Sequence, residues 1–295
     1  MHPAAAYLER IARHDLSDFS PLVVCEQTLG SVNREWRERL LACPSGLFAG
    51  HGDKLVCALE GDAAARSRQL GAAAAGWRDA GWLTGWRNEQ FAAHGEKGEL
   101  LFELERAAFR PLGLTSRAIH INGLTRLADG EIRMWVGRRS PEKSYEPNRM
   151  DNLVGGGVAA GETLRDACLR EGWEEAGIDA ARLSALEPVC RLLAERPVAR
   201  GLHREWLYVH DLWLPEGITP CNQDGEFSEH VLLPFAEVEA LLLDGRFMID
   251  AALVAIDCLL RHGHWAGQAA PFVRVFAELR EAVAGRVEPA DALGV

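Results

Sequence analysis

The sequence predicts a protein of the α/β (α+β) class, with strands early in its C-terminal half and helices after them. Apolar residues alternate with polar ones at 118–125, and a second apolar run at 132–137 follows the turn Asp129-Gly130. Two such runs around a turn are typical of a β-hairpin. Helices are expected further along the chain, at residues 235–243, 251–261 and 271–284.

The length of the chain indicates two domains. It has 295 residues, whereas one domain typically has about 100–200. Arg110-Pro111-Leu112-Gly113 interrupts the regular patterns, so we place the boundary there. We expect an N-terminal α+β extension at 1–113 and a second domain at 114–295.

The extension has mixed patterns of its own. Residues 1–15 look like an amphipathic helix, and further helices are expected at 33–42 and 66–77. Strands are expected at 21–27 and 54–59. Residues 81–91 are rich in aromatic side chains. They could belong to the core or form a stacking surface for a flat heteroaromatic ring.

Composition and charge exclude several classes of protein. Hydrophobic residues make up 48% of the chain and charged residues 25%, which excludes a mainly disordered protein. The net charge of −11 argues against a nucleic-acid polymer as partner. With only three lysines, arginine carries nearly all the positive charge, and its planar fork matches phosphate oxygens well.

The cysteines and the apolar runs indicate a cytoplasmic protein. The seven cysteines include no C-x-x-C pair, so neither a disulfide framework nor a zinc site is indicated. No run reaches the roughly 18 apolar residues that span a membrane. The N-terminal residues lack the basic start and apolar run of a signal peptide. We therefore expect no membrane partner.

A helix rich in carboxylates is expected from Thr163 to Gly177. Thr163 and Asp166 fit a capping box, and Gly177 can end the helix in a left-handed turn. On a helical wheel, three glutamates share one face, and small or apolar residues share the other. The glutamates are Glu171, Glu174 and Glu175; the opposite residues are Leu169, Gly172, Trp173 and Ala176.

Three carboxylates on one helix face suggest a cation site. Like charges at this spacing repel one another, and a bound cation would relieve the repulsion. Oxygen ligands favour Mg²⁺ or Mn²⁺. The alternative is an acidic face that only solvent screens, and the residues around the glutamates decide between the two.

The surrounding residues form a longer pattern. It runs from Gly156 through Glu162 and Arg170-Glu171 to Glu174-Glu175 and Gly177-Ile178. This pattern resembles the Nudix box, G-x5-E-x7-R-E-U-x-E-E-x-G-U, where U is a bulky aliphatic residue. Gly172 departs from it, and we expect the neighbouring Trp173 to fill the space.

A competing motif overlaps the same glycines. Gly155-x-Gly157-x-x-Ala160 satisfies the loose dinucleotide-binding fingerprint. That motif requires a helix that starts within the glycines and an acid after the next strand. Here the helix starts later and the next acids lie inside it, so we disfavour this interpretation.

The resemblance to Nudix proteins implies a fold and a chemistry. The implied fold is an α/β/α sandwich with a mixed sheet, and the implied activity is hydrolysis of a diphosphate in a small molecule. Glu171, Glu174, Glu175 and the carbonyl of Gly155 would hold Mg²⁺ or Mn²⁺. By the same resemblance, Arg170 and Glu162 would orient these carboxylates.

Further candidates come from loops. Glu226, with Glu229 behind it, is the candidate for an additional acid of the site, although either can be an ordinary exposed acid. Bases near the glycines could hold phosphates, or could be ordinary surface bases. These bases are Arg138, Arg139, Lys143 and Arg149.

Other segments are similar to one subgroup of the family, the Nudix domains related to thiamine pyrophosphokinase. These segments include 85–91, 135–140, 200–215, 222–226 and 251–263. The resemblance implies hydrolysis of thiamine diphosphate, and preferentially its oxo and oxy forms, to the monophosphate. Residues 1–113 would then be a cap that helps to select the substrate.

Alternatives to this function stay open. One is a Nudix hydrolase of another nucleoside diphosphate linked to a moiety X, and another is a non-catalytic Nudix-fold sensor or binding module. The sequence also leaves a homodimer open.

Overall fold

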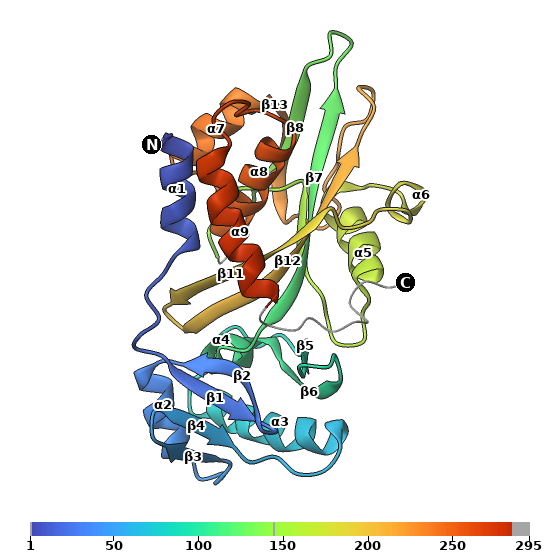
Figure 1. The fold of residues 1–295 in the computed structure, drawn as a ribbon. Coiled ribbons are helices and arrows are strands. Elements are labelled where there is room, and N and C mark those ends of the chain that lie inside the picture. Colours follow the sequence, from blue (N-terminus) through green and yellow to red (C-terminus); the bar gives the residue numbers. More distant parts are fainter. Residues whose placement is uncertain (1, 144, 285–295) are drawn as a thin grey trace.

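The computed structural model describes residues 2–143 and 145–284, and a seven-stranded mixed sheet forms its centre (Figure 1). The strands are β7 (Ser116–Arg126), β8 (Ile132–Arg139), β9 (Met150–Asp151), β10 (Val154–Gly157), β11 (Cys190–Val198), β12 (Gly201–Trp213) and β13 (Phe227–Pro234). The main path runs β11-β12-β7-β8-β13, with β10 beside β7 and β9 beside β8. Strands β7 and β12 are parallel and the other pairs are antiparallel. The predicted α+β class with a mixed sheet is confirmed.

Helices cover both faces of this sheet. On one face, Leu124 and Met134 belong to an apolar core shared with helices from both ends of the chain. These helices are α1 (Pro3–Ala12), α7 (Phe235–Leu243), α8 (Ile249–Arg261) and α9 (Ala270–Ala284). On the other face, Ile119 and Ile121 pack with α5 (Leu164–Ala176) and α6 (Ala180–Leu183). Residues that alternate along β7 thus serve two cores, and the predicted sandwich is confirmed.

The helix predicted at the N-terminus packs far from the segment that follows it. Ala4 and Leu8 of α1 lie in one core with α8 and α9. The three helices expected near the C-terminus are found as α7, α8 and α9. Residues 3–12 therefore share the core of the C-terminal segment, while the boundary at residue 113 stays a prediction.

The rest of the N-terminal segment has its own core and two small sheets. The strands β1 (Ser20–Val24), β2 (Gln27–Val32), β3 (Phe48–His51) and β4 (Lys54–Cys57) form one sheet, and β5 (Gln90–His94) and β6 (Leu100–Glu105) form the other. The helices are α2 (Arg34–Leu41), α3 (Ala63–Asp79), the 3₁₀ turn η1 (Arg106–Ala108) and α4 (Phe109–Leu112). The strand expected at 21–27 ends earlier, because Cys25 and Glu26 adopt positive φ and turn the chain into β2.

The aromatic residues at 81–91 mostly serve this second core. The rings of Trp36 and Trp82 meet edge to face, with centroids 6.4 Å apart. Phe91 of β5 is buried against Phe109, and it also reaches the cavity described below. The core interpretation of this patch is therefore supported, with Phe91 at its border.

Helix α5 begins and ends as predicted. Both hydrogen bonds of the Thr163–Asp166 capping box form, and Gly177 has a φ of 63°. The expected role of Trp173 is wrong, because its side chain is 55% exposed. The space beside Gly172 is instead filled by Leu183 of α6, whose Cδ1 would lie 2.5 Å from a Cβ at Gly172.

Candidate active site

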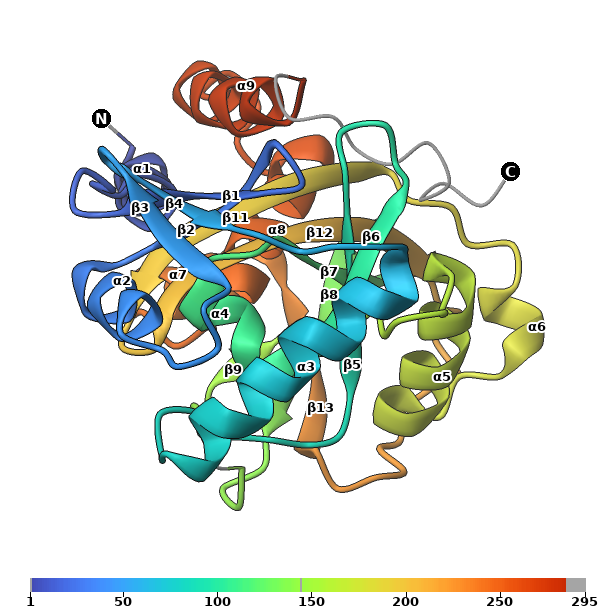
Figure 2. The same ribbon diagram turned by 90° about the horizontal axis from the view of Figure 1, so that it is seen from below.

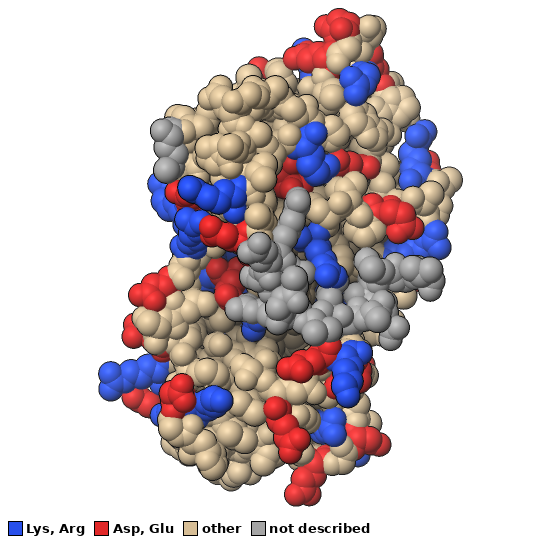
Figure 3. Space-filling view, in the orientation of Figure 1, with Lys and Arg blue, Asp and Glu red and all other residues tan. Residues whose placement is uncertain are grey.

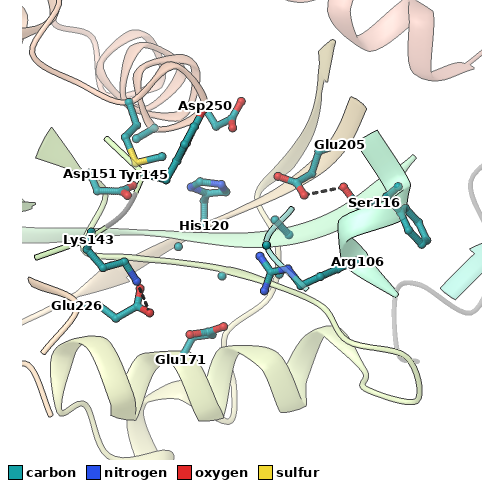
Figure 4. Close-up of a pocket in the computed structure, with 18 of the residues that line it drawn as sticks. Arg106, Ser116, His120, Lys143, Tyr145, Asp151, Glu171, Glu205, Glu226 and Asp250 are labelled. Atoms are coloured by element: carbon teal, nitrogen blue, oxygen red, sulfur yellow. Dashed lines mark hydrogen bonds and ion pairs between the residues drawn. The ribbon is translucent and has the colours of Figure 1, made fainter. Parts of the chain in front are cut away.

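A cavity of about 330 Å³ lies where the Nudix-like segment meets the N-terminal segment. Its lining includes Gly155, Glu171 and Glu175 on one side, and Phe91 and Arg106 from the N-terminal segment. Figure 4 shows Glu171 pointing from α5 towards His120 of β7 across this space. In Figure 2, which looks at the molecule from the side of the N-terminal segment, β5 and one end of α3 lie towards the side that carries α5. The cavity is thus built by both parts of the chain.

Two glutamates of α5 lie beside the glycine strand β10, and Glu175 is buried while Glu171 is partly buried. Glu175 is 2% exposed and its Oε2 accepts a hydrogen bond from the backbone N–H of Gly155 at 2.8 Å. Burial and the nearby charge of Glu171 raise the pKa of Glu175 well above its usual value. A Cβ at Gly156 would lie 2.1 Å from Oε1 of Glu171, so only glycine allows this approach.

Glu171 has a strongly shifted acidity as well. Burial raises its pKa to about 7, against the opposing hydrogen bond from Arg170, and the charges of Glu174 and Glu226 raise it further. Two neighbouring carboxylates therefore resist ionisation in the same buried place. Such a place favours a bound cation.

Arg170 connects the carboxylates of this region. It donates two hydrogen bonds to Glu162, at 2.7 and 3.0 Å, and its Nη1 lies 2.7 Å from Oε1 of Glu171. The same Nη1 lies 3.4 Å from Glu174. Burial raises the pKa of Glu162, but the hydrogen bonds from Arg170 and Ala159 outweigh it and lower that pKa. Arg170 and Glu162 thus form a rigid bidentate pair next to the cluster.

Three of the predicted loop residues also line the cavity. Nζ of Lys143 lies 2.5 Å from Oε1 of Glu226. Arg139 is buried, and it donates to Asp151 at 3.3 Å and to the carbonyl of Tyr145 at 3.2 Å. Lys143, Glu226 and Arg139 therefore line the same cavity as Glu171 and Glu175, and their roles stay predictions.

The other predicted loop residues lie outside the lining. Arg138 pairs with Glu229 across the β8–β13 register, and both are partly exposed. Arg149 donates to the backbone carbonyl of Gly245. Their roles in phosphate binding or catalysis stay predictions, without support from this geometry.

Several polar residues of the cavity were not predicted. Nδ1 of His120 lies 2.8 Å from Oδ1 of Asn152. Ser116, which donates to Glu205 at 2.7 Å, precedes His120 by four residues on the same strand. The two-residue period of a strand places both on one face, and that period was the available signal.

A buried ion pair closes another part of the lining. Arg196 donates to Asp250 at 2.5 and 3.1 Å, and Nε2 of His203 lies 3.1 Å from the same carboxylate. His203 and Arg196 hold the pKa of Asp250 well below its usual value although burial raises it. These residues come from β11, β12 and the start of α8, so only the tertiary structure brings them together.

Comparison with known proteins defines the class. The chain matches the NUDIX domain at residues 119–252 and a domain of unknown function, DUF4743, at residues 3–116. It is 30% identical to Nudix hydrolase 24, chloroplastic, of Arabidopsis thaliana, over 93% of this chain and 77% of that protein. The protein therefore belongs to the Nudix hydrolase family. It is a hydrolase of a family that cleaves diphosphates in small molecules and generally uses divalent metal ions.

Two further proteins are similar to the chain. Nudix hydrolase 20, chloroplastic, of Arabidopsis thaliana is 29% identical, over 90% of this chain and 74% of that protein. The solved structure of DR0079 from Deinococcus radiodurans is 26% identical, covers 58% of this chain and 99% of its own, and has a TM-score of 0.44. In the described part of the chain, no helix has the length and apolar character that a membrane crossing requires. The cytoplasmic location stays a prediction, since both plant relatives are named as chloroplastic.

Proposed function

We propose that the protein is a Mg²⁺- or Mn²⁺-dependent diphosphatase acting on thiamine diphosphate or, preferentially, its oxo and oxy forms, with the monophosphate as product. One observation carries the chemistry. Glu171, which is partly buried, and Glu175, which is buried, lie together at a cavity beside Gly155, with raised pKa values. The choice of substrate is supported by the subgroup segments of the sequence, among them residues 85–91, which include the cavity-lining Gly85, Arg87 and Phe91.

The donor set fits a divalent cation. It consists only of oxygens, which Mg²⁺ and Mn²⁺ prefer. Glu171, Glu174, Glu175 and the carbonyl oxygen of Gly155 would hold the ion. When bound, the ion lowers the pKa of an attacking water and neutralises phosphate oxygens. Burial raises the pKa values of Glu171 and Glu175, and the charge repulsion that raises them further would be relieved at the same time.

The chain's own residues have separate tasks in this proposal. Arg170 and Glu162 fix the orientation of the carboxylates through their bidentate pair. Arg139 and Lys143 offer positive charge to the phosphates from the same lining. Glu226 is the further acid of the site, placed to accept a proton from water once its partner Lys143 engages the substrate.

The N-terminal segment acts as a substrate-selecting cap in this proposal. Phe91, Arg106 and Phe109 contribute an aromatic and a cationic surface to the cavity. A backbone hydrogen bond of 2.8 Å from Ala160 to Gln90 ties the segment to the loop after the glycine strand. A homodimer stays a prediction, since nothing in the single chain bears on it.

The test measures phosphate release from oxythiamine diphosphate by the purified full chain with Mg²⁺. Glu174→Gln should lower kcat by at least about 100-fold, because it removes one charged ligand of the cation. Glu237→Gln, an exposed residue of α7, is the matched control and should keep wild-type kcat.

Two outcomes would count against parts of the proposal. An unchanged rate in Glu174→Gln overturns the assignment of the metal site. A higher kcat/KM for a nucleotide sugar or an oxidised nucleotide than for the thiamine compounds overturns the assignment of the substrate, but it leaves the proposed hydrolysis of a diphosphate intact.

A further inference from the structure

A group of arginines forms part of the cavity wall away from the carboxylate helix. Arg106 lies in η1, Arg110 in α4, and Arg200 in the turn between β11 and β12. Figure 4 shows Arg106 extending into the cavity above α5. Segments separated by about ninety residues of sequence therefore deliver three guanidinium groups to one cavity.

Local contacts hold these side chains in place. Nη1 of Arg200 donates to the carbonyl of Thr84 at 3.2 Å, which links the turn to the N-terminal segment. The guanidinium of Arg110 lies 5.7 Å from the ring centroid of Tyr145, and that of Arg106 lies 5.2 Å from the ring of Phe91. Aromatic contacts of this kind orient a guanidinium without neutralising its charge.

The group carries more positive charge than its surroundings balance. Arg106 pairs with Glu89 at 2.5 Å. For Arg110 and Arg200, no ion pair is found within residues 2–143 and 145–284. Burial lowers the pKa of Arg200, and the neighbouring Arg110 and Arg106 lower it further, as expected for crowded cations.

Such crowding is unusual in a chain with a net charge of −11. On the face shown in Figure 3, acidic and basic side chains are interspersed. The part of the wall where Arg110 and Arg200 lie next to Arg106 is suited to an anionic ligand, because an anion offsets the repulsion between these guanidinium groups. Guanidinium groups also match phosphate oxygens with paired hydrogen bonds.

We propose that Arg106, Arg110 and Arg200 bind the terminal phosphoryl group of the substrate, at a place separate from the carboxylates of α5. The inference rests on the proposed function, because it adds a second phosphate contact within the same cavity. It assigns a defined task to the N-terminal segment, which supplies two of the three arginines. Substrates whose diphosphate ends in a free phosphate would be preferred over diesters in which both phosphates are substituted.

The test is binding of inorganic pyrophosphate to the full chain in EDTA, measured by isothermal titration calorimetry. Arg110→Gln and Arg200→Gln should each raise Kd by about ten-fold or more, and the double variant by about 100-fold, since charge-assisted hydrogen bonds to an anion are lost. Arg68→Gln, an exposed arginine of α3, is the matched control and should keep the wild-type Kd.

The measurement separates this inference from the proposed function. Glu174→Gln should bind pyrophosphate in EDTA no more weakly than wild type, although it is expected to lose hydrolysis. Wild-type Kd values in both arginine variants overturn the inference and leave the metal site untouched. Arg110→Gln removes no hydrogen bond that its side chain forms within the described residues, so it remains a valid test if Arg200→Gln fails to fold.

A second comparison tests the preference for a free terminal phosphate. The ratio of kcat/KM for a monoester of diphosphate to that for a diester should fall by about ten-fold in Arg110→Gln. An unchanged ratio means that these arginines do not contact the terminal phosphate, and it overturns the proposal.

Discussion

Two buried acids, Asp250 and Glu175, line the same cavity, and their pKa values are shifted in opposite directions. Asp250 is 8% exposed and its pKa lies well below the usual value, whereas Glu175 is 2% exposed and its pKa lies well above it. Burial acts in the same direction on both, since it disfavours the charged form of any carboxyl group. The difference must therefore come from the neighbours.

The neighbours of the two acids differ in charge. Asp250 receives two hydrogen bonds from Arg196, and His203 lies 3.1 Å away. Glu175 receives one backbone hydrogen bond, and among the charged residues Glu171 has the largest effect on its pKa, which it raises. The first group is complete within the chain. In the second group the neighbouring acids raise the pKa of Glu175 beyond the effect of burial, and this repulsion is the physical reason for expecting the metal there.

The largest predicted effect concerns the stability of the protein without metal. Asp250→Asn should lower the free energy of unfolding by about 3 kcal/mol, because Arg196 would be left buried without a charged partner. Glu175→Gln should leave it unchanged or raise it, because the amide keeps an acceptor for the Gly155 N–H. Urea unfolding in EDTA at neutral pH measures both changes.

The same pair of variants should respond differently to Mg²⁺. Ligand binding raises the unfolding midpoint of the wild type and of Asp250→Asn, since both keep the carboxylates of α5. Glu175→Gln should gain much less. A loss of stability in Glu175→Gln as large as that in Asp250→Asn would contradict the comparison, because both acids would then be structurally balanced.

The cluster of glutamates on α5 could be predicted from the sequence, because the residues that form it lie close together in the chain. The capping box at Thr163, the terminating Gly177 and the glutamate spacing all fall within the single segment from Thr163 to Gly177. The hairpin of β7 and β8 was predictable for the same reason, since the turn Asp129-Gly130 joins its strands directly.

Two clusters could not be predicted, because only the tertiary structure brings their residues together. They are Asp250 with Arg196 and His203, and the three arginines Arg106, Arg110 and Arg200. Arg196 and Asp250 are 54 residues apart, and nothing in either local pattern indicates the other. The helical wheel failed at Trp173 for a related reason. It assumes one buried side, but α5 is buried on two, against Leu183 of α6 and against the glycine strand.

A smaller effect is predicted for the way in which the free energy of unfolding depends on pH. The pKa of Glu171 is about 7 in the folded protein, above its usual 4.5, so the folded state holds this proton more tightly than the unfolded state. The stabilisation is full below about pH 4.5 and is lost as the pH rises through about 7. Without metal, Glu171→Gln should therefore be more stable than wild type at about pH 8, by on the order of 2 kcal/mol, and not at about pH 4.

Asp250 should show no such dependence in this window. Its folded pKa is lowered, so its contribution is present above the unfolded value and is lost only in more acidic solution. In a His203→Gln background, the destabilisation by Asp250→Asn should be equal at about pH 5.5 and about pH 8. A difference between wild type and Glu171→Gln that does not change with pH would show that Glu171 is not strained by burial.

The smallest expected effect tests whether the N-terminal segment helps to position the glutamates of α5. A Cβ at Gly157 would lie 2.9 Å from Cζ of Phe91, and the carbonyl of Gly157 accepts a hydrogen bond from Arg170. Gly157→Ala should therefore displace the strand, and lower kcat/KM by about ten-fold with little change in stability. Phe91→Leu should restore part of the loss in the double variant, because it removes the clash.

Gly71→Ala is the matched control, since a Cβ there meets nothing within 4 Å. It should leave kcat/KM unchanged. Gly157→Ala should change the shift of the unfolding midpoint that Mg²⁺ causes. Asp250→Asn should lower the free energy of unfolding by the same amount in the Gly157→Ala background as in the wild type. If Phe91→Leu gives no rescue, the contact between the N-terminal segment and the glycine strand does not position the carboxylates.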